Sequence, residues 1–145
     1  MKSFQIVEAL KARGLRITAP RRAIIEALDG DRSHPSADAV LARVRRRRPG
    51  ISFTTVYATL ESLVEQGLIS RVTSDPSRSR FDTVTDPHDH LVCTSCGRID
   101  DVKRAARRRM SVRGFTVTSV HVEYHGICRG CAPRERSESR GCRGR

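Results

Sequence analysis

The sequence predicts an α+β protein. An N-terminal winged helix-turn-helix domain is expected over residues 1–84, followed by a small α/β domain with a structural four-cysteine zinc site over residues 85–131. Three observations predict this fold class. Helical apolar patterns with capping residues fill the front half, two short strand-like runs follow them, and two Cys-x-x-C pairs lie in the back half. A generic helical bundle is the alternative for the front half.

Four helices are expected in the front half. Serine or threonine N-caps precede three of them, at Thr18, Ser36 and Ser52. Pro20 suits the first turn of the second helix, where its missing N–H costs nothing. Glycines end three of the helices, at Gly14, Gly30 and Gly67.

The fourth helix lies in the segment SFTTVYATLESLVEQGLI and has one apolar stripe, formed by Val56, Leu60, Leu63 and Val64. Four polar side chains fall largely off that stripe, namely Thr54, Thr55, Tyr57 and Thr59. Small hydroxyl groups and a tyrosine on an exposed helical face suit hydrogen bonds to phosphates and base edges. Strand-like runs at Ile69–Thr73 and Arg80–Val84 then complete the pattern of a winged helix.

The back half predicts strands at His90–Cys93, Arg98–Val102 and Phe115–Tyr124, with a basic helical stretch at Lys103–Arg113. Residues 132–145 have the composition of a basic disordered tail, in which Cys142 is expected to be an incidental thiol.

The net charge of the 145-residue chain is +12, from 28 Lys and Arg against 16 Asp and Glu. Such an excess attracts phosphate backbones, although a solvated basic surface is the alternative. The opening MKSFQIVEALKARG has no apolar run of the length that a signal peptide or membrane span needs. We therefore expect a cytoplasmic protein without a membrane partner, in which cysteines hold metal rather than form disulfides.

Two Cys-x-x-C pairs, Cys93 with Cys96 and Cys128 with Cys131, have the composition of a closed tetrahedral zinc site. Such a site stabilises a small fold and performs no chemistry. A redox-active thiol pair is the alternative.

A second cluster contains imidazoles and carboxylates. Strand alternation puts His88 and His90 on one face and Asp89 on the other. Asp82 and Asp101 can reach the same point, and His34, from the front half, can join them. Three imidazoles and two carboxylates suit divalent Fe²⁺, Mn²⁺ or Zn²⁺. If His34 joins the cluster, one ion links the two halves.

The segments HPSADAV, FTTVYATLESLVEQGLI, RFD followed by HDHLVCTSCGRIDDV, and HGICRGC together resemble the ferric uptake regulator family, in that family's order. The finer resemblance is to its peroxide-sensing, PerR-like branch, because Asp101 stands where iron-sensing members have glutamate. The resemblance implies a metal-dependent homodimeric repressor, not an enzyme, that binds double-stranded DNA at palindromic operators, with residues 85–131 as the metal-binding and dimerisation domain.

The same resemblance assigns residues to roles. The structural Zn²⁺ would lie on Cys93, Cys96, Cys128 and Cys131, and a regulatory Fe²⁺ or Mn²⁺ on His34, Asp82, His88, His90 and Asp101. Peroxide would oxidise His34 or His88 when iron is bound. The expected DNA contacts are Arg16, Arg21, Arg22, Thr54, Thr55 and Tyr57.

Two departures from the family pattern stand out. The interval from Asp101 to Gly114 is short and very basic, and Ala58 replaces a polar residue that many members carry. An iron- or zinc-responsive uptake repressor without peroxide sensing is the main alternative function. A non-haem iron enzyme and a zinc-storage module are further alternatives, but the first would need a substrate pocket and the second would not need a winged helix.

Overall fold

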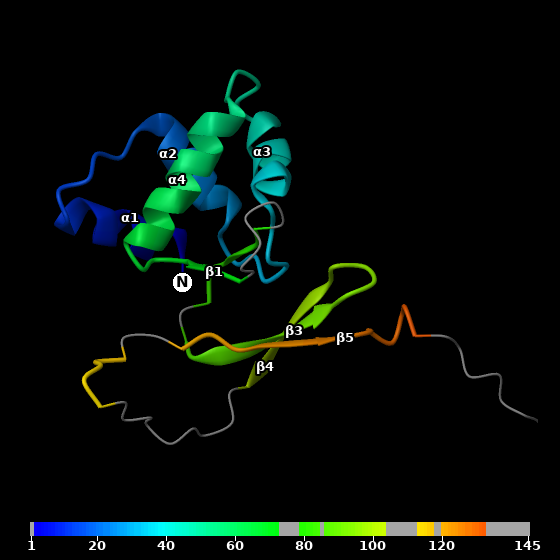
Figure 1. Cartoon of the computed structure of the whole chain (residues 1–145). Coiled ribbons are helices and arrows are strands. Elements are labelled where there is room, and N and C mark those ends of the chain that lie inside the picture. Colours follow the sequence, from blue (N-terminus) through cyan, green and yellow to red (C-terminus); the bar gives the residue numbers. More distant parts are fainter. Residues whose placement is uncertain (1, 73–78, 85, 104–112, 118–119, 133–145) are drawn as a thin grey trace, which may run out of the picture.

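The structure is a computed structural model that describes residues 2–72, 79–84, 86–103, 113–117 and 120–132. Within these ranges the front half contains four α-helices and a two-stranded sheet (Figure 1). The helices are α1 (Ser3–Ala12), α2 (Ala19–Ala27), α3 (Ala37–Arg45) and α4 (Phe53–Glu65). The sheet pairs β1 (Ser70–Arg71) with β2 (Phe81–Asp82) in antiparallel fashion.

The three predicted N-caps are confirmed. The side-chain oxygens of Thr18, Ser36 and Ser52 each accept a hydrogen bond from a backbone N–H in the first helical turn, over 3.4, 3.2 and 3.1 Å. Each cap satisfies a donor that the helix itself leaves unpaired. The predicted glycines after α1, α2 and α4 have φ of +74°, +70° and +64°, a left-handed conformation that favours glycine.

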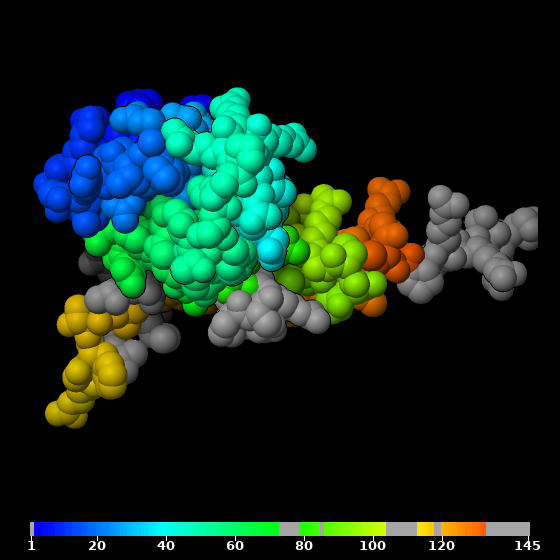
Figure 2. All heavy atoms as spheres, turned by 90° about the horizontal axis from the view of Figure 1, so that it is seen from above, coloured from blue at the N-terminus to red at the C-terminus, as the bar shows by residue number. Residues whose placement is uncertain are grey.

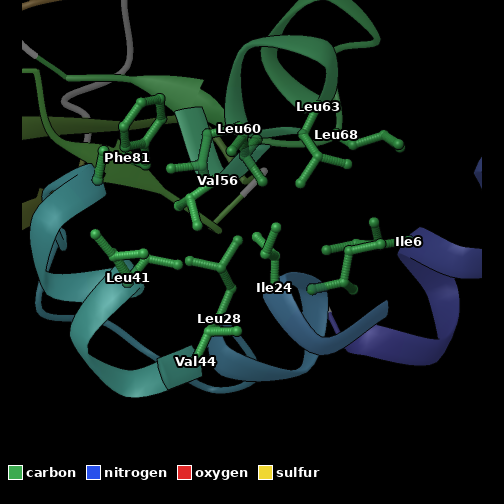
Figure 3. Packing of buried hydrophobic residues seen from close by; sticks show 14 of the residues in the cluster. Ile6, Ile24, Leu28, Leu41, Val44, Val56, Leu60, Leu63, Leu68 and Phe81 are labelled. Atoms are coloured by element: carbon green, nitrogen blue, oxygen red, sulfur yellow. The ribbon is translucent and has the colours of Figure 1, made fainter. Parts of the chain in front are cut away.

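One apolar core lies between the helices and the first sheet (Figure 3). Ile6, Ile24 and Leu60 contribute from α1, α2 and α4, and Phe81 brings β2 into the same cluster. The amide of Phe81 also donates to the carbonyl of Pro35 over 3.0 Å, so β2 is fixed to the loop that precedes α3. This contact places Asp82 close to His34.

The predicted position of Thr59 is wrong. Thr59 is buried, and its hydroxyl donates to the carbonyl of Thr55, one turn earlier, over 2.8 Å. Thr59 lies three residues after Val56 and four before Leu63, so it shares their buried face of α4. Because the backbone satisfies the hydroxyl, the side chain tolerates burial.

The back half is a three-stranded sheet in the order β4-β3-β5 (Figure 1). Strand β3 (His88–Cys93) runs antiparallel to β4 (Ile99–Lys103) and parallel to β5 (Glu123–Gly126). In the described part of the chain beyond residue 84, Cys93 is the one residue that belongs to the buried hydrophobic set. The sheet therefore has very little apolar core of its own.

The long strand predicted at Phe115–Tyr124 is wrong in its bounds, because β5 begins only at Glu123. Strand β5 runs parallel to β3 with His90 opposite Glu123, and the His90 amide also donates to the carbonyl of Val122. In this register residues 115–117 lie before the start of β3. Most of the predicted basic helix (104–112), the turn between β1 and β2 (73–78) and most of the predicted tail (133–145) lie outside the described residues. None of the helices α1–α4 has the length and hydropathy that crossing a membrane requires.

Candidate metal centres and DNA-binding helix

The four paired cysteines come together as the sequence predicts. Cys93 ends β3, Cys96 lies in the turn before β4, and Cys128 and Cys131 follow β5. Their Sγ atoms all lie within 4.8 Å of one another, and all four are free thiols. Cys96 Sγ is 3.8 Å from Cys128 Sγ. Zinc–sulfur bonds of about 2.3 Å in a tetrahedron place sulfurs about 3.8 Å apart, so the cluster fits Zn²⁺.

Backbone amides prepare this cluster for metal. The N–H of Cys128 donates to Cys93 Sγ over 3.3 Å. Hydrogen bonds from the backbone amides of Cys128, Cys96 and Ser95 lower the pKa of Cys93 to about 6. The thiolate is the metal-binding form of cysteine, and these hydrogen bonds favour it at Cys93.

The second cluster joins the two halves of the chain. His34 comes from the loop before α3 and Asp82 from β2, whereas His88 and His90 come from β3 and Asp101 from β4. Ligand atoms of His34, Asp82, His88 and His90 lie within 4.8 Å of one another. Oδ1 of Asp101 lies 2.8, 3.6 and 4.0 Å from the Nε2 atoms of His34, His88 and His90.

Strand geometry accounts for most of this convergence. His88 and His90 share one face of β3, and their Nε2 atoms are 2.9 Å apart. His90 lies directly opposite Asp101 in the β3–β4 register, so both side chains point to the same side of the sheet. His34 reaches them from a backbone with φ of +50°, a left-handed conformation that residues other than glycine seldom adopt.

The cluster contains buried polar atoms without a hydrogen bond. Within the described ranges, both ring nitrogens of His34 and Oδ2 of Asp82 have no hydrogen-bond partner, although ligand atoms approach closely. Short approaches without hydrogen-bond geometry are expected where several donor atoms face one cation, and unsatisfied buried groups otherwise cost about 1–3 kcal/mol each. The donor set therefore fits a divalent metal.

The protonation states suit metal binding. Burial lowers the pKa of His34 against the opposing pull of Asp101 and Asp82, which favours neutral imidazole. Burial raises the pKa of Asp82, but the approach of His90, the hydrogen bond from the Val84 amide and the other nearby imidazoles lower it by more. Nδ1 of His88 lies 2.7 Å from the carbonyl oxygen of Asp86. Since a carbonyl only accepts, Nδ1 carries the hydrogen and Nε2 presents its lone pair to the cluster.

A network of bonds centred on Asp31 holds the loop that carries His34. The Asp31 carboxylate accepts a hydrogen bond from the amide of Ser33 over 2.8 Å and pairs with Arg43 of α3. Its backbone carbonyl accepts from the hydroxyl of Thr83 over 3.0 Å. Sequence reasoning missed Asp31, because its role depends on Thr83, more than fifty residues later.

The predicted DNA-contacting residues lie on α2, α4 and the connection before α2. Thr54 and Thr55 are exposed in the first turn of α4, and Tyr57 is half-buried and stacked on Phe53, with ring centroids 5.9 Å apart. Arg16 and Arg22 are exposed, whereas Arg21 is half-buried and donates to the carbonyl of Arg16 over 2.9 Å. Phe53, which is 43% exposed and stacks on Tyr57, was not among the predicted residues. Its position directly after the N-cap Ser52 could have indicated an exposed aromatic ring at the start of α4.

A winged helix joined to a sheet through one cluster of metal ligands, with a second cluster of four cysteines beside that sheet, defines a class of metal-dependent DNA-binding proteins. Within that class, residues 12–131 match the model of the ferric uptake regulator family, and the chain belongs to that family.

Relatives with known names support this placement. The chain is 36% identical over 139 residues to the peroxide operon regulator of Bacillus subtilis, covering 90% of this chain and 94% of that protein. It is 34% identical over 133 residues to the peroxide-responsive repressor PerR of Staphylococcus epidermidis, covering 86% and 87%. Both relatives are matched over nearly their whole length.

Solved structures share the fold. The ferric uptake regulator of Helicobacter pylori superimposes with a TM-score of 0.72 at 20% identity, covering 93% of this chain and 97% of that one. PerR from Streptococcus pyogenes gives a TM-score of 0.51 at 29% identity, covering 90% and 94%. The α+β fold with a winged helix is therefore confirmed.

Proposed function

We propose that the chain is a metal-dependent transcriptional repressor that releases DNA when peroxide oxidises its regulatory site. The observation that carries the proposal is the convergence of ligand atoms from both halves: Nε2 of His34, before α3, lies 2.8 Å from Oδ1 of Asp101, in β4. An ion held by both halves fixes their relative position. The relatives named for peroxide response support the choice of signal.

The regulatory ion is assigned to His34, Asp82, His88, His90 and Asp101, and the structural Zn²⁺ to Cys93, Cys96, Cys128 and Cys131. The two sets differ in chemistry, since thiolates favour zinc, whereas imidazoles and carboxylates accept Fe²⁺ or Mn²⁺. Metal that binds the closed arrangement better than the open one raises DNA affinity, and DNA raises metal affinity by the same factor. A nearly complete shift between the two states needs about 5 kcal/mol of differential binding.

DNA recognition is assigned to the exposed first turn of α4. Thr54, Thr55 and Tyr57 would contact bases and phosphates in the major groove, and Arg16, Arg21 and Arg22 would contact phosphates. Figure 1 shows the start of α4 at the end of the helical half away from strands β3–β5, which leaves this turn open to a duplex.

The partner of the back half is proposed to be a second copy of the chain. The back half buries little apolar surface and exposes large apolar side chains: Phe115 is 77%, Ile127 60% and Tyr124 46% exposed. Exposed apolar surface of this kind marks an association site. A symmetric dimer carries two reading helices and so would bind a palindromic operator.

The residues proposed to sense peroxide are His34 and His88. The side chain of His34 is 1% and that of His88 12% exposed, and both contribute Nε2 to the cluster. Bound Fe²⁺ would supply the redox chemistry, and Mn²⁺ would not. Loss of one imidazole ligand weakens the link between the halves. The assigned role is regulation of DNA rather than turnover of a substrate, and it would operate in the cytoplasm.

The test is operator binding by the Mn²⁺-loaded and Fe²⁺-loaded protein before and after peroxide, at one stated salt concentration because phosphate contacts make affinity salt-dependent. We expect both forms to bind DNA and only the iron form to release it, with one oxygen gained at His34 or His88 by mass spectrometry. Release by metal removal alone, with no oxygen gained and no effect of peroxide on the iron form, would instead assign a metal-responsive uptake repressor.

A further inference from the structure

A polar cavity of about 370 Å³ lies between the two halves of the chain, beside both metal-ligand clusters. Arg32, Ser33, His34 and Arg80 line it from the front half, and residues 96–100, around the turn between β3 and β4, line it from the back half. Figure 1 shows this turn beside the loop that leads into α3, and Figure 2 shows the yellow-green strand region against the cyan part of the front half. The cavity is therefore a junction between the two halves.

Three arginines contribute to the lining, and one of them is already paired. Arg98 donates from Nε and Nη2 to the same oxygen of Asp100, over 3.0 and 2.8 Å. In the part of the chain that the structure describes, Arg32 and Arg80 have no carboxylate partner. With Asp100 offset by Arg98, the lining keeps two guanidinium groups without a carboxylate partner, Arg32 and Arg80, beside Cys96 of the four-cysteine cluster.

Arg80 extends from the start of β2 to the cysteine-rich turn. Its Nη2 atom lies 3.9 Å from the position that a Cβ on Gly97 would occupy, which is ordinary van der Waals distance. Gly97 has φ of +71°, a left-handed conformation that favours glycine in this tight turn, and its backbone lies beside the guanidinium. A cation of the front half thus lies against the back half, beside the turn that carries Cys96.

We infer that this cavity binds a small oxyanion, a phosphate or a short dicarboxylate, between Arg32 and Arg80. Guanidinium groups present paired N–H donors that match the two oxygens of a carboxylate or phosphate. The volume lies near the lower end of the range for small-molecule sites, about 300–1,000 Å³, which suits a metabolite-sized anion. Arg32 and Arg80, two cations that line one cavity, repel each other less when an anion lies between them.

Occupancy of the cavity is coupled to the regulatory cluster. Arg32 is two residues before His34, Arg80 is two residues before Asp82, and Asp100 precedes Asp101. The back half lines the cavity through residues 96–100, so an anion bound to the two front-half arginines also lies against that turn. Such an anion favours the same closed arrangement as the regulatory ion, and each raises the affinity of the other by one factor. This coupling rests on the proposed function, whereas binding of the anion does not.

The first experiment measures anion binding directly. Inorganic phosphate and, separately, succinate are titrated into the zinc-loaded full chain by calorimetry, with chloride holding ionic strength constant. We expect saturable binding of one anion per chain by at least one of them, weakened at least tenfold by Arg32→Ala and by Arg80→Ala. Arg47→Ala removes one exposed charge elsewhere and should leave binding unchanged.

The inference is overturned if neither anion shows saturable binding. It is also overturned if Arg47→Ala weakens binding as much as the other two variants, because the anion is then attracted diffusely to exposed arginines. Retained zinc content and an unchanged circular dichroism spectrum show that each variant is folded. Arg32 is exposed in a loop, so its variant keeps the test valid if Arg80→Ala unfolds.

The second experiment measures Mn²⁺ affinity with and without the bound anion. A severalfold gain that Arg32→Ala abolishes supports the coupling, and no change contradicts it while leaving the anion site intact. If Mn²⁺ binding does not depend on His34 at all, the proposed function fails, and the calorimetric result for the anion is unaffected.

Discussion

Nε2 of His34 lies 2.8 Å from Oδ1 of Asp101, although the two residues are far apart in the sequence and belong to different halves of the fold. Two local features bring them together. His34 has a left-handed backbone conformation, and strand β4 places Asp101 directly opposite His90. Nε2 of His34 lies farther, 3.9 Å, from Oδ1 of Asp82.

His34→Ala should lower the affinity for regulatory Mn²⁺ by more than about 100-fold, because even residues that merely orient a ligand typically cost 10–100-fold. Competition with a metal-sensitive dye measures this. His125→Ala is the matched control, since His125 is exposed and contacts Glu123 rather than the cluster. Equal Mn²⁺ affinity in the two variants would remove His34 from the site.

Asp31→Asn should weaken Mn²⁺ binding without changing a ligand, because Asp31 holds the loop that carries His34. It should also lower the free energy of unfolding by about 1 kcal/mol at neutral pH, near the upper end for a partly exposed ion pair. Urea titration and Mn²⁺ competition measure the two effects. Unchanged Mn²⁺ affinity together with a measurable stability loss would limit Asp31 to a structural role.

The stability difference between wild type and Asp31→Asn has a defined pH dependence. Burial raises the pKa of Asp31, but the hydrogen bonds from Arg43 and Ser33 lower the pKa by more than burial raises it, so the net shift is downward. A carboxyl whose folded pKa is depressed stabilises the protein above its unfolded pKa of about 3.9, and the contribution is lost as pH falls through the folded value. We expect a constant difference above about pH 5 and a shrinking one below about pH 4. A difference that grew in acid would contradict the assigned shift.

Cys96→Ser should abolish stoichiometric zinc binding and unfold the back half, since structural zinc contributes of order 10 kcal/mol to folding. Metal analysis and hydrogen exchange measure the two effects, and α1–α4 should stay protected because their core contains no zinc ligand. Cys142→Ser, which changes the thiol outside the paired motifs, should retain one zinc per chain.

Arg22→Ala and Thr54→Ala should weaken operator binding in different ways. Loss of a phosphate contact from Arg22 makes the plot of log K against log salt shallower by about 0.9 per contact. Loss of the Thr54 hydroxyl lowers affinity for the operator and leaves that slope unchanged, because the group is uncharged. Fluorescence anisotropy at several salt concentrations separates the two, and a slope unchanged by Arg22→Ala would exclude Arg22 from the phosphate contacts.

Local signals predicted much of this fold. The caps Thr18, Ser36 and Ser52 were predictable because each bonds a backbone amide three residues away. Alternation on one strand likewise predicted that His88 and His90 share a face. Where a feature depends on a distant partner, sequence reasoning failed. The alternating run from Phe115 looks like a strand, but pairing with β3 begins only at Glu123.

The metal-ligand clusters divide in the same way. Spacing alone predicted the four cysteines, since each pair closes locally. His34 was only a candidate, because its approach to Asp101 depends on the packing of the whole front half. Nothing in the sequence indicated the role of Asp31. Its backbone carbonyl accepts a hydrogen bond from Thr83, which follows strand β2 and is distant in the sequence.

The near absence of buried hydrocarbon in strands β3–β5 has a consequence for the living cell. A polypeptide leaving the ribosome can fold its helical half with its own apolar side chains, but folding of the other half requires a zinc ion from the cell. Zinc starvation should therefore deplete the finished protein through proteolysis, so that its abundance reports the zinc supply.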